Sequence, residues 1–263
     1  MDYDMSLKRT ILSEKEIILI EDVIAEFGII VTFEQVYSIL KKTRNRQSAR
    51  NLINKLTKNG WLVRIMKGVY AVASLESRGS LSIHPFKIAR TLVNDSYISF
   101  EAALQYHGMF DQMLRTVVSI SLKRRKDKDI HGVNYKFVKT KKDLFFGWSE
   151  ERIENHLTNV ASCEKAILDM LMFDRNEYYV DLVYEKLKEY KSKFDFALMG
   201  EFSVKYSKTV QRIAGFLFDK LSINSDYLYK LVGRRNGCSY MIKDSGKFNA
   251  KWSLYYCGRF DED

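Results

Sequence analysis

The spacing of apolar residues predicts two helices near the N-terminus. In residues 14–27 the apolar side chains form a broad stripe, acidic residues occupy the first turn, and Gly28 ends the pattern. Thr32 is a good N-cap for a second helix over residues 33–42. The apolar residues of this second helix again share one face, so both helices are expected to pack on a common core.

A third helix is predicted from about residue 46 to residue 58, with Asn45 as its N-cap and Asn59–Gly60 as its stop. Four apolar residues recur at i, i+3, i+4 and i+7 and are expected to face inward: Ala49, Leu52, Ile53 and Leu56. The opposite side then carries basic and amide side chains together: Arg46, Gln47, Arg50, Asn51, Asn54, Lys55 and Lys58. This outer face contains no acidic residue.

Two short β-prone runs follow at residues 61–65 and 69–73, and Gly68 between them suits the positive φ of a tight hairpin turn. Three helices followed by a basic hairpin are the order of a winged helix-turn-helix. We assign this domain to residues 1–78. The linker to the rest of the chain is expected within residues 73–82, which hold four serines and little that could be buried.

Residues 79–263 are predicted to form a larger mixed domain. Pro85 suits the first turn of a helix, and Ser99 and Ser162 are placed to cap two others. Between these caps the hydrophobic pattern changes to period two, which predicts antiparallel strands at residues 116–122, 133–140 and 143–148. The predicted fold class is therefore α+β, with an N-terminal winged helix-turn-helix followed by a larger mixed domain that has a small antiparallel sheet and several helices.

Charge is sorted along the N-terminal domain. Residues 41–67 hold nine Lys and Arg and no Asp or Glu, whereas residues 1–40 hold eight acidic residues against three basic ones. A solvated helix face usually mixes signs for i, i+4 pairing, and the third helix has no acidic partner within reach along the chain. The net charge of +10 and the pI near 9.3 also favour nucleic acid or another anionic surface as the partner.

In a winged helix-turn-helix the start of the third helix enters the major groove of DNA, while the hairpin touches the flanking backbone. Because arginine matches guanine and side-chain amides match adenine, five residues are predicted to read base edges: Arg46, Gln47, Ser48, Arg50 and Asn51. Six others are predicted to hold phosphates of double-stranded DNA: Lys41, Lys42, Arg44, Lys55, Arg64 and Lys67. The alternative interpretation is a solvated face on a winged helix that binds another protein.

Other classes of protein are not supported by the sequence. No run approaches about 20 apolar residues, and the N-terminus lacks the basic-then-apolar order of a secretory signal, so we expect a cytoplasmic protein without a membrane span. The cysteines are odd in number, have no CxxC spacing and lie far from the histidines. We therefore predict no metal site, no disulfide framework and no cofactor, and we expect the cysteines to be buried as small hydrophobic residues.

Catalysis is also unsupported. The obvious carboxylates are Glu164, Asp169, Asp174 and Asp181. Glu164 and Asp169 lie five residues apart on a predicted helix and do not share a face. No glycine-rich phosphate loop, GxSxG, HExxH or Cys/His pairing accompanies them. The prediction is that the protein is not an enzyme.

Three further features each have a functional and a structural interpretation. His107 could be a ligand or a catalytic base, but a histidine at a helix end more often bonds carbonyl groups. The basic loop at residues 123–128 could contact a DNA backbone or could simply be solvated. The aromatic residues of the C-terminal tail could stack on bases, although packing against helices is favoured: Trp252, Tyr255 and Tyr256.

Four segments, taken in order, resemble a known family. They are GWLVRIMKGVYAV (60–72), SYISFEAALQYHGM (96–109), VASCEKAILDML (160–171) and KFNAKWSL (247–254). Their order and spacing, over about residues 15 to 255, are similar to those of the AbiEi-type antitoxins of type IV toxin-antitoxin systems, which act in phage abortive infection and are also described as predicted transcriptional regulators.

The resemblance implies an N-terminal domain that represses its own operon at inverted repeats. It also implies that residues 79–263 counteract a cognate nucleotidyltransferase-like toxin, without requiring a stable complex with it. The winged-helix match places the DNA contacts on residues that the pattern had already selected, namely Arg46, Gln47, Ser48, Arg50, Asn51, Arg64 and Lys67. The alternative is a winged-helix regulator whose C-terminal domain is a ligand sensor or an unrecognised enzyme.

Overall fold

The computed structural model of the chain describes residues 12–73, 83–154, 156–233 and 237–261. The chain divides into two compact units, residues 1–84 and residues 85–263, which we call the N-terminal unit and the C-terminal unit. The predicted boundary and linker lie mainly in 74–82, outside the described residues. The α+β class is confirmed, with a small antiparallel sheet beside the N-terminal helices.

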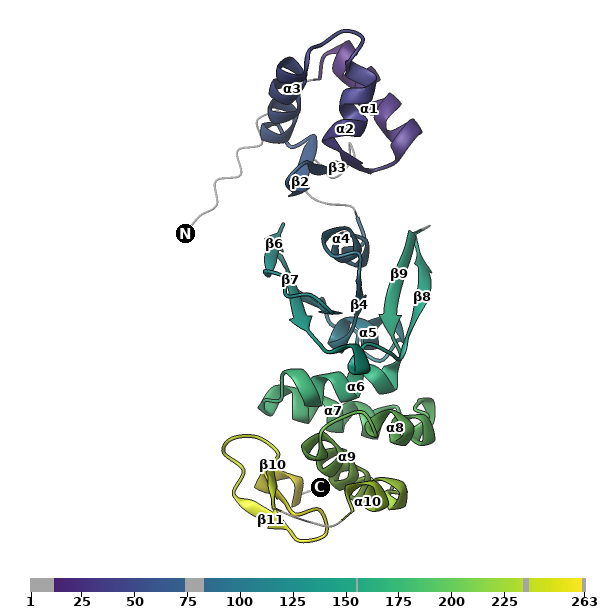
Figure 1. Ribbon diagram of the computed structural model, residues 1–263, viewed down its shortest axis with the longest axis vertical. Coiled ribbons are helices and arrows are strands. Elements are labelled where there is room, and N and C mark those ends of the chain that lie inside the picture. Colours follow the sequence, from purple (N-terminus) through teal and green to yellow (C-terminus); the bar gives the residue numbers. More distant parts are fainter. Residues whose placement is uncertain (1–11, 74–82, 155, 234–236, 262–263) are drawn as a thin grey trace. The chain divides into compact units, whose positions relative to one another are not determined.

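The N-terminal unit has the element order of a winged helix (Figure 1). Its elements are α1 (Glu14–Phe27), β1 (Ile30–Thr32), α2 (Phe33–Leu40), α3 (Arg46–Lys58), β2 (Leu62–Met66) and β3 (Val69–Val72). All three strands pair antiparallel in the order β1-β3-β2. Strand β1 is short and was not predicted, because three residues are too few to show a period.

Capping side chains fix the starts of these helices as the sequence predicted. The Thr32 hydroxyl accepts a hydrogen bond from the amide of Gln35 (3.2 Å), and the Asn45 side chain accepts one from the amide of Ser48 (2.8 Å). Helix α1 ends at Phe27, directly before Gly28. The inward faces of all three helices meet in one apolar core with Trp61 and Tyr70 of the hairpin region.

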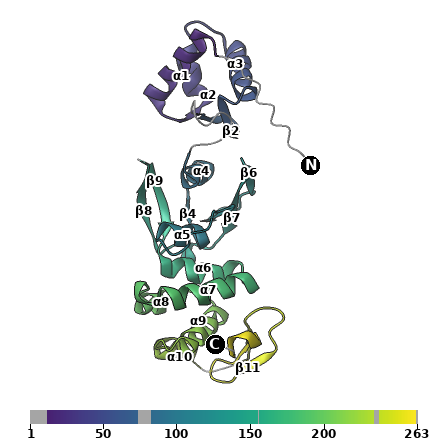
Figure 2. The same ribbon diagram turned by 180° about the vertical axis from the view of Figure 1, so that it is seen from behind.

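The C-terminal unit begins with α4 (Pro85–Leu92) and is built around a mixed sheet in the order β6-β7-β5-β4-β9-β8. The strands are β4 (Ser96–Ile98), β5 (Thr116–Ser121), β6 (Lys128–Ile130), β7 (Val133–Lys139), β8 (Trp148–Ile153) and β9 (His156–Ala161). Helix α4 packs against β4, β5 and β9, and lies between the two halves of the sheet (Figures 1 and 2).

Helices and a second small sheet complete this unit. The helices are α5 (Phe100–Tyr106), α6 (Cys163–Phe173), α7 (Glu177–Glu189), α8 (Phe196–Ser203), α9 (Lys208–Lys220) and α10 (Asp226–Val232), with short 3₁₀ turns at Lys142–Leu144, Lys191–Lys193 and Gly258–Asp261. The small sheet joins β10 (Ser239–Tyr240), β12 (Leu254–Tyr256) and β11 (Lys247–Asn249). Helix α6 is central, because it packs against α5, α7, α8, α9 and β9.

Three details of this unit differ from the sequence predictions. Strands β5 and β7 pair parallel rather than antiparallel, since β6 and its turn separate them and allow the chain to re-enter the sheet in the same direction. The predicted strand 143–148 is mostly a 3₁₀ turn and loop before β8. Ser99 occupies the N-cap position of α5, but its hydroxyl donates to Asp169 instead of capping the helix.

No helix within the described residues is both long and apolar enough to cross a bilayer.

Candidate nucleic-acid interface

The outer face of α3 is assembled as the periodicity predicted. Its four predicted inward residues are buried, with at most 8% of each side chain exposed. Of the five predicted base readers, Arg46, Gln47, Arg50 and Asn51 are exposed and Ser48 is partly exposed. The structure therefore brings these side chains to one surface, and their contact with DNA stays a prediction.

Hydrogen bonds order part of this face. The Gln47 amide nitrogen donates to the Asn51 side-chain oxygen (3.1 Å), one helical turn away. The Arg44 guanidinium donates to the Ser48 hydroxyl (3.1 Å) and so is held beside the start of α3. Amides that are already oriented lose less side-chain entropy when they bind a base edge, so this arrangement suits recognition of adenine.

Phe33, the first residue of α2, lies where α2, α3 and the hairpin meet. The guanidinium groups of Arg46 and Arg50 lie over its ring, at 5.1 Å and 5.7 Å from the centroid. The Phe33 amide also donates to the carbonyl of Gly68 in the hairpin turn (2.8 Å). The turn that carries Lys67 is thus tied to the same point as the first turns of α3.

Acidic residues from other helices do reach this basic surface, which corrects the inference drawn from the sequence. Glu34 of α2 forms an ion pair with Arg46, and Glu16 of α1 accepts a bond from the Lys55 ammonium at 2.9 Å. The bond from Lys55 lowers the pKa of the Glu16 carboxyl, as do the bonds from Ser13. Neither acid lies within one helical turn of its partner in the sequence, so a search at i, i+4 could not find the pairs.

These two pairs have different consequences. The Arg46–Glu34 pair is open to solvent, with 48% and 64% of the side chains exposed. Arg46 can therefore leave Glu34 and contact a base or a phosphate at a small cost in free energy. The Glu16 side chain is only 9% exposed. Lys55 is therefore held toward α1 more firmly than the other predicted phosphate contacts.

The residues predicted to hold phosphates are all exposed: Lys41, Lys42, Arg44, Lys55, Arg64 and Lys67. They come from three places, namely the turn between α2 and α3, the outer side of α3, and the hairpin. Gly68 in the hairpin turn has φ of 76°, so a glycine is needed to place Lys67 at this tip.

The carboxylates considered for catalysis take structural roles. Glu164 is 5% exposed and accepts bonds from the Cys163 thiol and the Asp195 amide. Asp174 pairs with Lys136 and Asp181 pairs with Arg259, each at 2.7 Å. Among the described residues, no group of three or more His, Cys, Asp or Glu side chains is placed to hold a metal ion.

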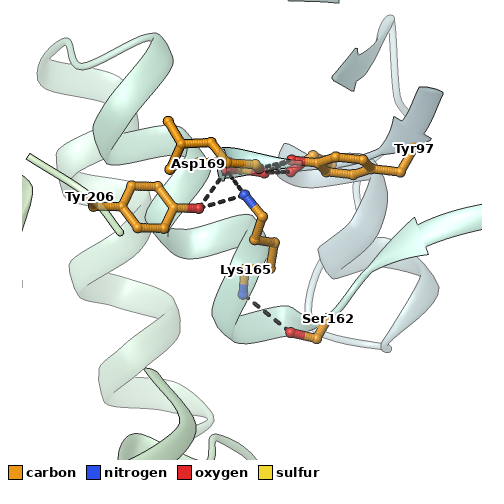
Figure 3. A network of polar contacts seen from close by, with 7 residues as sticks. Tyr97, Ser162, Lys165, Asp169 and Tyr206 are labelled. Carbon is orange, nitrogen blue, oxygen red and sulfur yellow. Dashed lines mark hydrogen bonds and ion pairs between the residues drawn. The ribbon is translucent and has the colours of Figure 1, made fainter. Parts of the chain in front are cut away.

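Asp169 is fully buried at the centre of a polar network (Figure 3). Its carboxylate accepts bonds from Lys165, Tyr97, Ser99 and Tyr206, at 2.5 to 3.0 Å. Burial lowers the pKa of the Lys165 ammonium, against the attraction of Asp169. Burial and the nearby carboxylate raise the pKa of both tyrosine hydroxyls well above the usual value, so they act as protonated donors. The network joins α6 to β4, to the start of α5 and to the connection between α8 and α9.

His107, the basic loop at residues 123–128 and the cysteines were the other candidates for a functional role. His107 bonds the carbonyl of Ala161 (2.8 Å), which is a structural role, although the carbonyl belongs to β9 and not to its own helix. In the basic loop, Lys123 and Arg125 face Asp95 at 3.8 and 3.7 Å. Cys163 and Cys257 are buried as expected, but Cys238, which lies just before β10, is exposed.

Comparisons with known proteins give a fold but no family. No protein-family model matches the chain, and no curated protein matches it. A crystal structure of the RV2827C protein from Mycobacterium tuberculosis matches 90% of this chain and 89% of its own chain, with a TM-score of 0.65 and 14% identical residues. At that identity the similarity shows that the two chains share a fold, and it shows nothing about function.

Proposed function

We propose that the chain is a DNA-binding transcriptional repressor whose N-terminal unit recognises operator DNA in its own promoter. The observation that carries the proposal is the convergence around Phe33, where the start of α3 and the hairpin turn present arginine, amide and lysine side chains on one exposed surface. This combination supplies donors for base edges beside point charges for phosphates. A surface that only needed to be soluble would not require the amides and arginines to share one side.

Recognition of the operator base sequence is tested with the Arg50→Ala variant in a mobility-shift assay. The DNA is the region upstream of the gene that encodes the chain. We expect a loss of about 1–3 kcal/mol in discrimination between the operator and a scrambled duplex, because a bidentate contact to one base is removed. Arg152→Ala, which removes an exposed arginine of β8 in the C-terminal unit, is the matched control and should leave discrimination unchanged. Equal discrimination by both variants and the unaltered chain would exclude Arg50 as a base reader.

We further propose, on the resemblance to AbiEi-type antitoxins, that the C-terminal unit counteracts a nucleotidyltransferase-like toxin. Support comes from the order of the resembling segments, two of which form the structural centre of this unit: Ser96–Met109 contains Tyr97 and Ser99, and Val160–Leu171 contains Lys165 and Asp169. The proposal does not require a stable complex between the two proteins.

A growth experiment separates the two activities. When the adjacent reading frame encodes such a toxin and its expression stops growth, co-expression of the chain from an unrelated promoter should restore growth. The Arg50→Ala variant should restore it equally, because base reading and antitoxicity reside in different units. Failure of both forms at matched protein levels would refute the antitoxin proposal and leave the DNA-binding proposal intact.

A further inference from the structure

The small sheet near the C-terminus presents aromatic side chains on one face. Strand β12 pairs parallel with β10 and antiparallel with β11, and the register places Tyr255 opposite both Tyr240 and Phe248. Residues at paired positions point to the same side of a sheet. Their chain neighbours Ser239 and Leu254 are buried on the other side, so the three aromatic residues lie on the outer face.

The three rings lie in a row with Tyr255 between Tyr240 and Phe248, and we call this row the aromatic stack. Tyr240 and Tyr255 are parallel, with centroids 4.6 Å apart and an interplanar angle of 9°. Phe248 lies on the other side of Tyr255 at 5.0 Å and is tilted by 50°. The outer rings are 49% and 51% exposed, whereas the central ring of Tyr255 is partly buried. Each outer ring therefore offers an aromatic surface to solvent.

We propose that this aromatic stack binds single-stranded RNA, with unstacked bases extending the stack at Tyr240 and at Phe248. Every base has a π-face, so a ring with one free face can stack on any base without reading its edge. RNA is the better fit than DNA because single-stranded loops and ends of RNA display unstacked bases, whereas duplex DNA keeps its bases stacked. The proposal is independent of the duplex interface on α3, with which it shares no residue.

The turn after β10 carries one lysine that a nucleic acid can use and an apolar segment of another protein cannot. The segment 237–258 that forms the sheet and its turns holds three lysines and one aspartate. Lys247 and Lys251 pair with Asp261 and Asp219. Lys243 and its neighbour Asp244 are both exposed, and Lys243 forms no ion pair with another described residue. Lys243 is therefore available to a phosphate of the bound strand.

The first test measures binding of a labelled oligouridylate of about ten nucleotides to the full chain by fluorescence anisotropy at low salt. Tyr240→Ala and Phe248→Ala should each weaken binding by at least about 5-fold, because each removes one stacking surface. Tyr240→Phe keeps the ring and should bind as the unaltered chain does. The matched control is Tyr227→Ala on α10, which removes a tyrosine of similar exposure, 51%, outside the stack.

Two outcomes would overturn this proposal: oligouridylate binding that is undetectable at low salt, and alanine variants that bind as tightly as the control. Operator binding by the same variants should be unchanged, which separates this test from that of the repressor proposal.

The second test identifies the partner. Oligouridylate that carries 5-iodouridine should form photocrosslinks to the peptides that contain Tyr240 or Phe248, and mass spectrometry locates them. In irradiated cells that produce the full chain, ribonuclease should shorten the adduct on these peptides to one or a few ribonucleotides, which mass spectrometry identifies. An adduct shortened only by deoxyribonuclease would overturn the assignment to RNA, and the absence of a nucleic-acid adduct would overturn the surface as a base-stacking site.

Discussion

Replacing Asp169 with alanine is expected to lower the free energy of unfolding of the C-terminal unit by about 3–5 kcal/mol. The Lys165 ammonium has no exposed surface, and it approaches the rings of Phe146, Tyr206 and Tyr97 at 4.8 to 5.4 Å. Without the carboxylate, Lys165 must lose its proton or remain charged and unpaired among these rings. The hydroxyls of Tyr97 and Tyr206 (Figure 3) lose an acceptor, and so does the hydroxyl of Ser99.

Hydrogen exchange of the α6 amides, recorded at increasing urea concentrations, measures this loss of unfolding free energy within the C-terminal unit. The control is the double variant Lys165→Met with Asp169→Leu, which replaces the ion pair with apolar groups of similar size. It should cost clearly less than Asp169→Ala, because no buried charge is left unpaired. Equal losses in the two variants would mean that packing around α6 and the acceptor lost by the three hydroxyls, and not the buried charge, decide stability at this point.

The periodic and capped parts of the fold could be predicted from the sequence. Ala49, Leu52, Ile53 and Leu56 turn inward because a 3.6-residue period leaves a helix only one apolar side. Ser162 caps α6 as its position before an apolar run suggested. The outer face of α3 follows from the same period, so the predicted base readers were found on one surface without any knowledge of tertiary contacts.

Contacts between segments that are distant in the sequence could not be predicted from periodicity and capping. The pairing of Arg46 with Glu34 depends on how α2 packs on α3, and the strand order around β5 depends on where β6 and β7 return to the sheet. Trp252 packs over the bare Cα of Gly215 and Tyr256 against Phe216, as predicted. Tyr255 was predicted to pack against helices as well, but its ring lies between Tyr240 and Phe248 of the small sheet. The aromatic stack was missed because Tyr240, Phe248 and Tyr255 belong to three very short strands, and only the register brings them together.

The affinity of the full chain for its operator duplex should fall by about 10³-fold or more between 50 and 200 mM salt, as expected for a protein that neutralises about six phosphates. Each lysine or arginine that contacts a phosphate releases bound counterions, so its removal should reduce the slope of log affinity against log salt by about 0.9. Lys67→Ala removes the charge at the hairpin tip, beside the start of α3, and should show this reduction with operator and scrambled DNA alike.

Lys55→Ala distinguishes a phosphate contact from an internal ion pair. Lys55 is held by Glu16, whose carboxylate is nearly buried, so it neutralises a protein charge before any DNA arrives. We therefore expect Lys55→Ala to leave the slope nearly unchanged, although Lys55 was predicted from the sequence to hold a phosphate. Mobility shifts at four or five salt concentrations measure both slopes. A full reduction for Lys55→Ala and none for Lys67→Ala would place the duplex along the outer side of α3 and away from the hairpin, which contradicts the docking inferred from the contacts around Phe33.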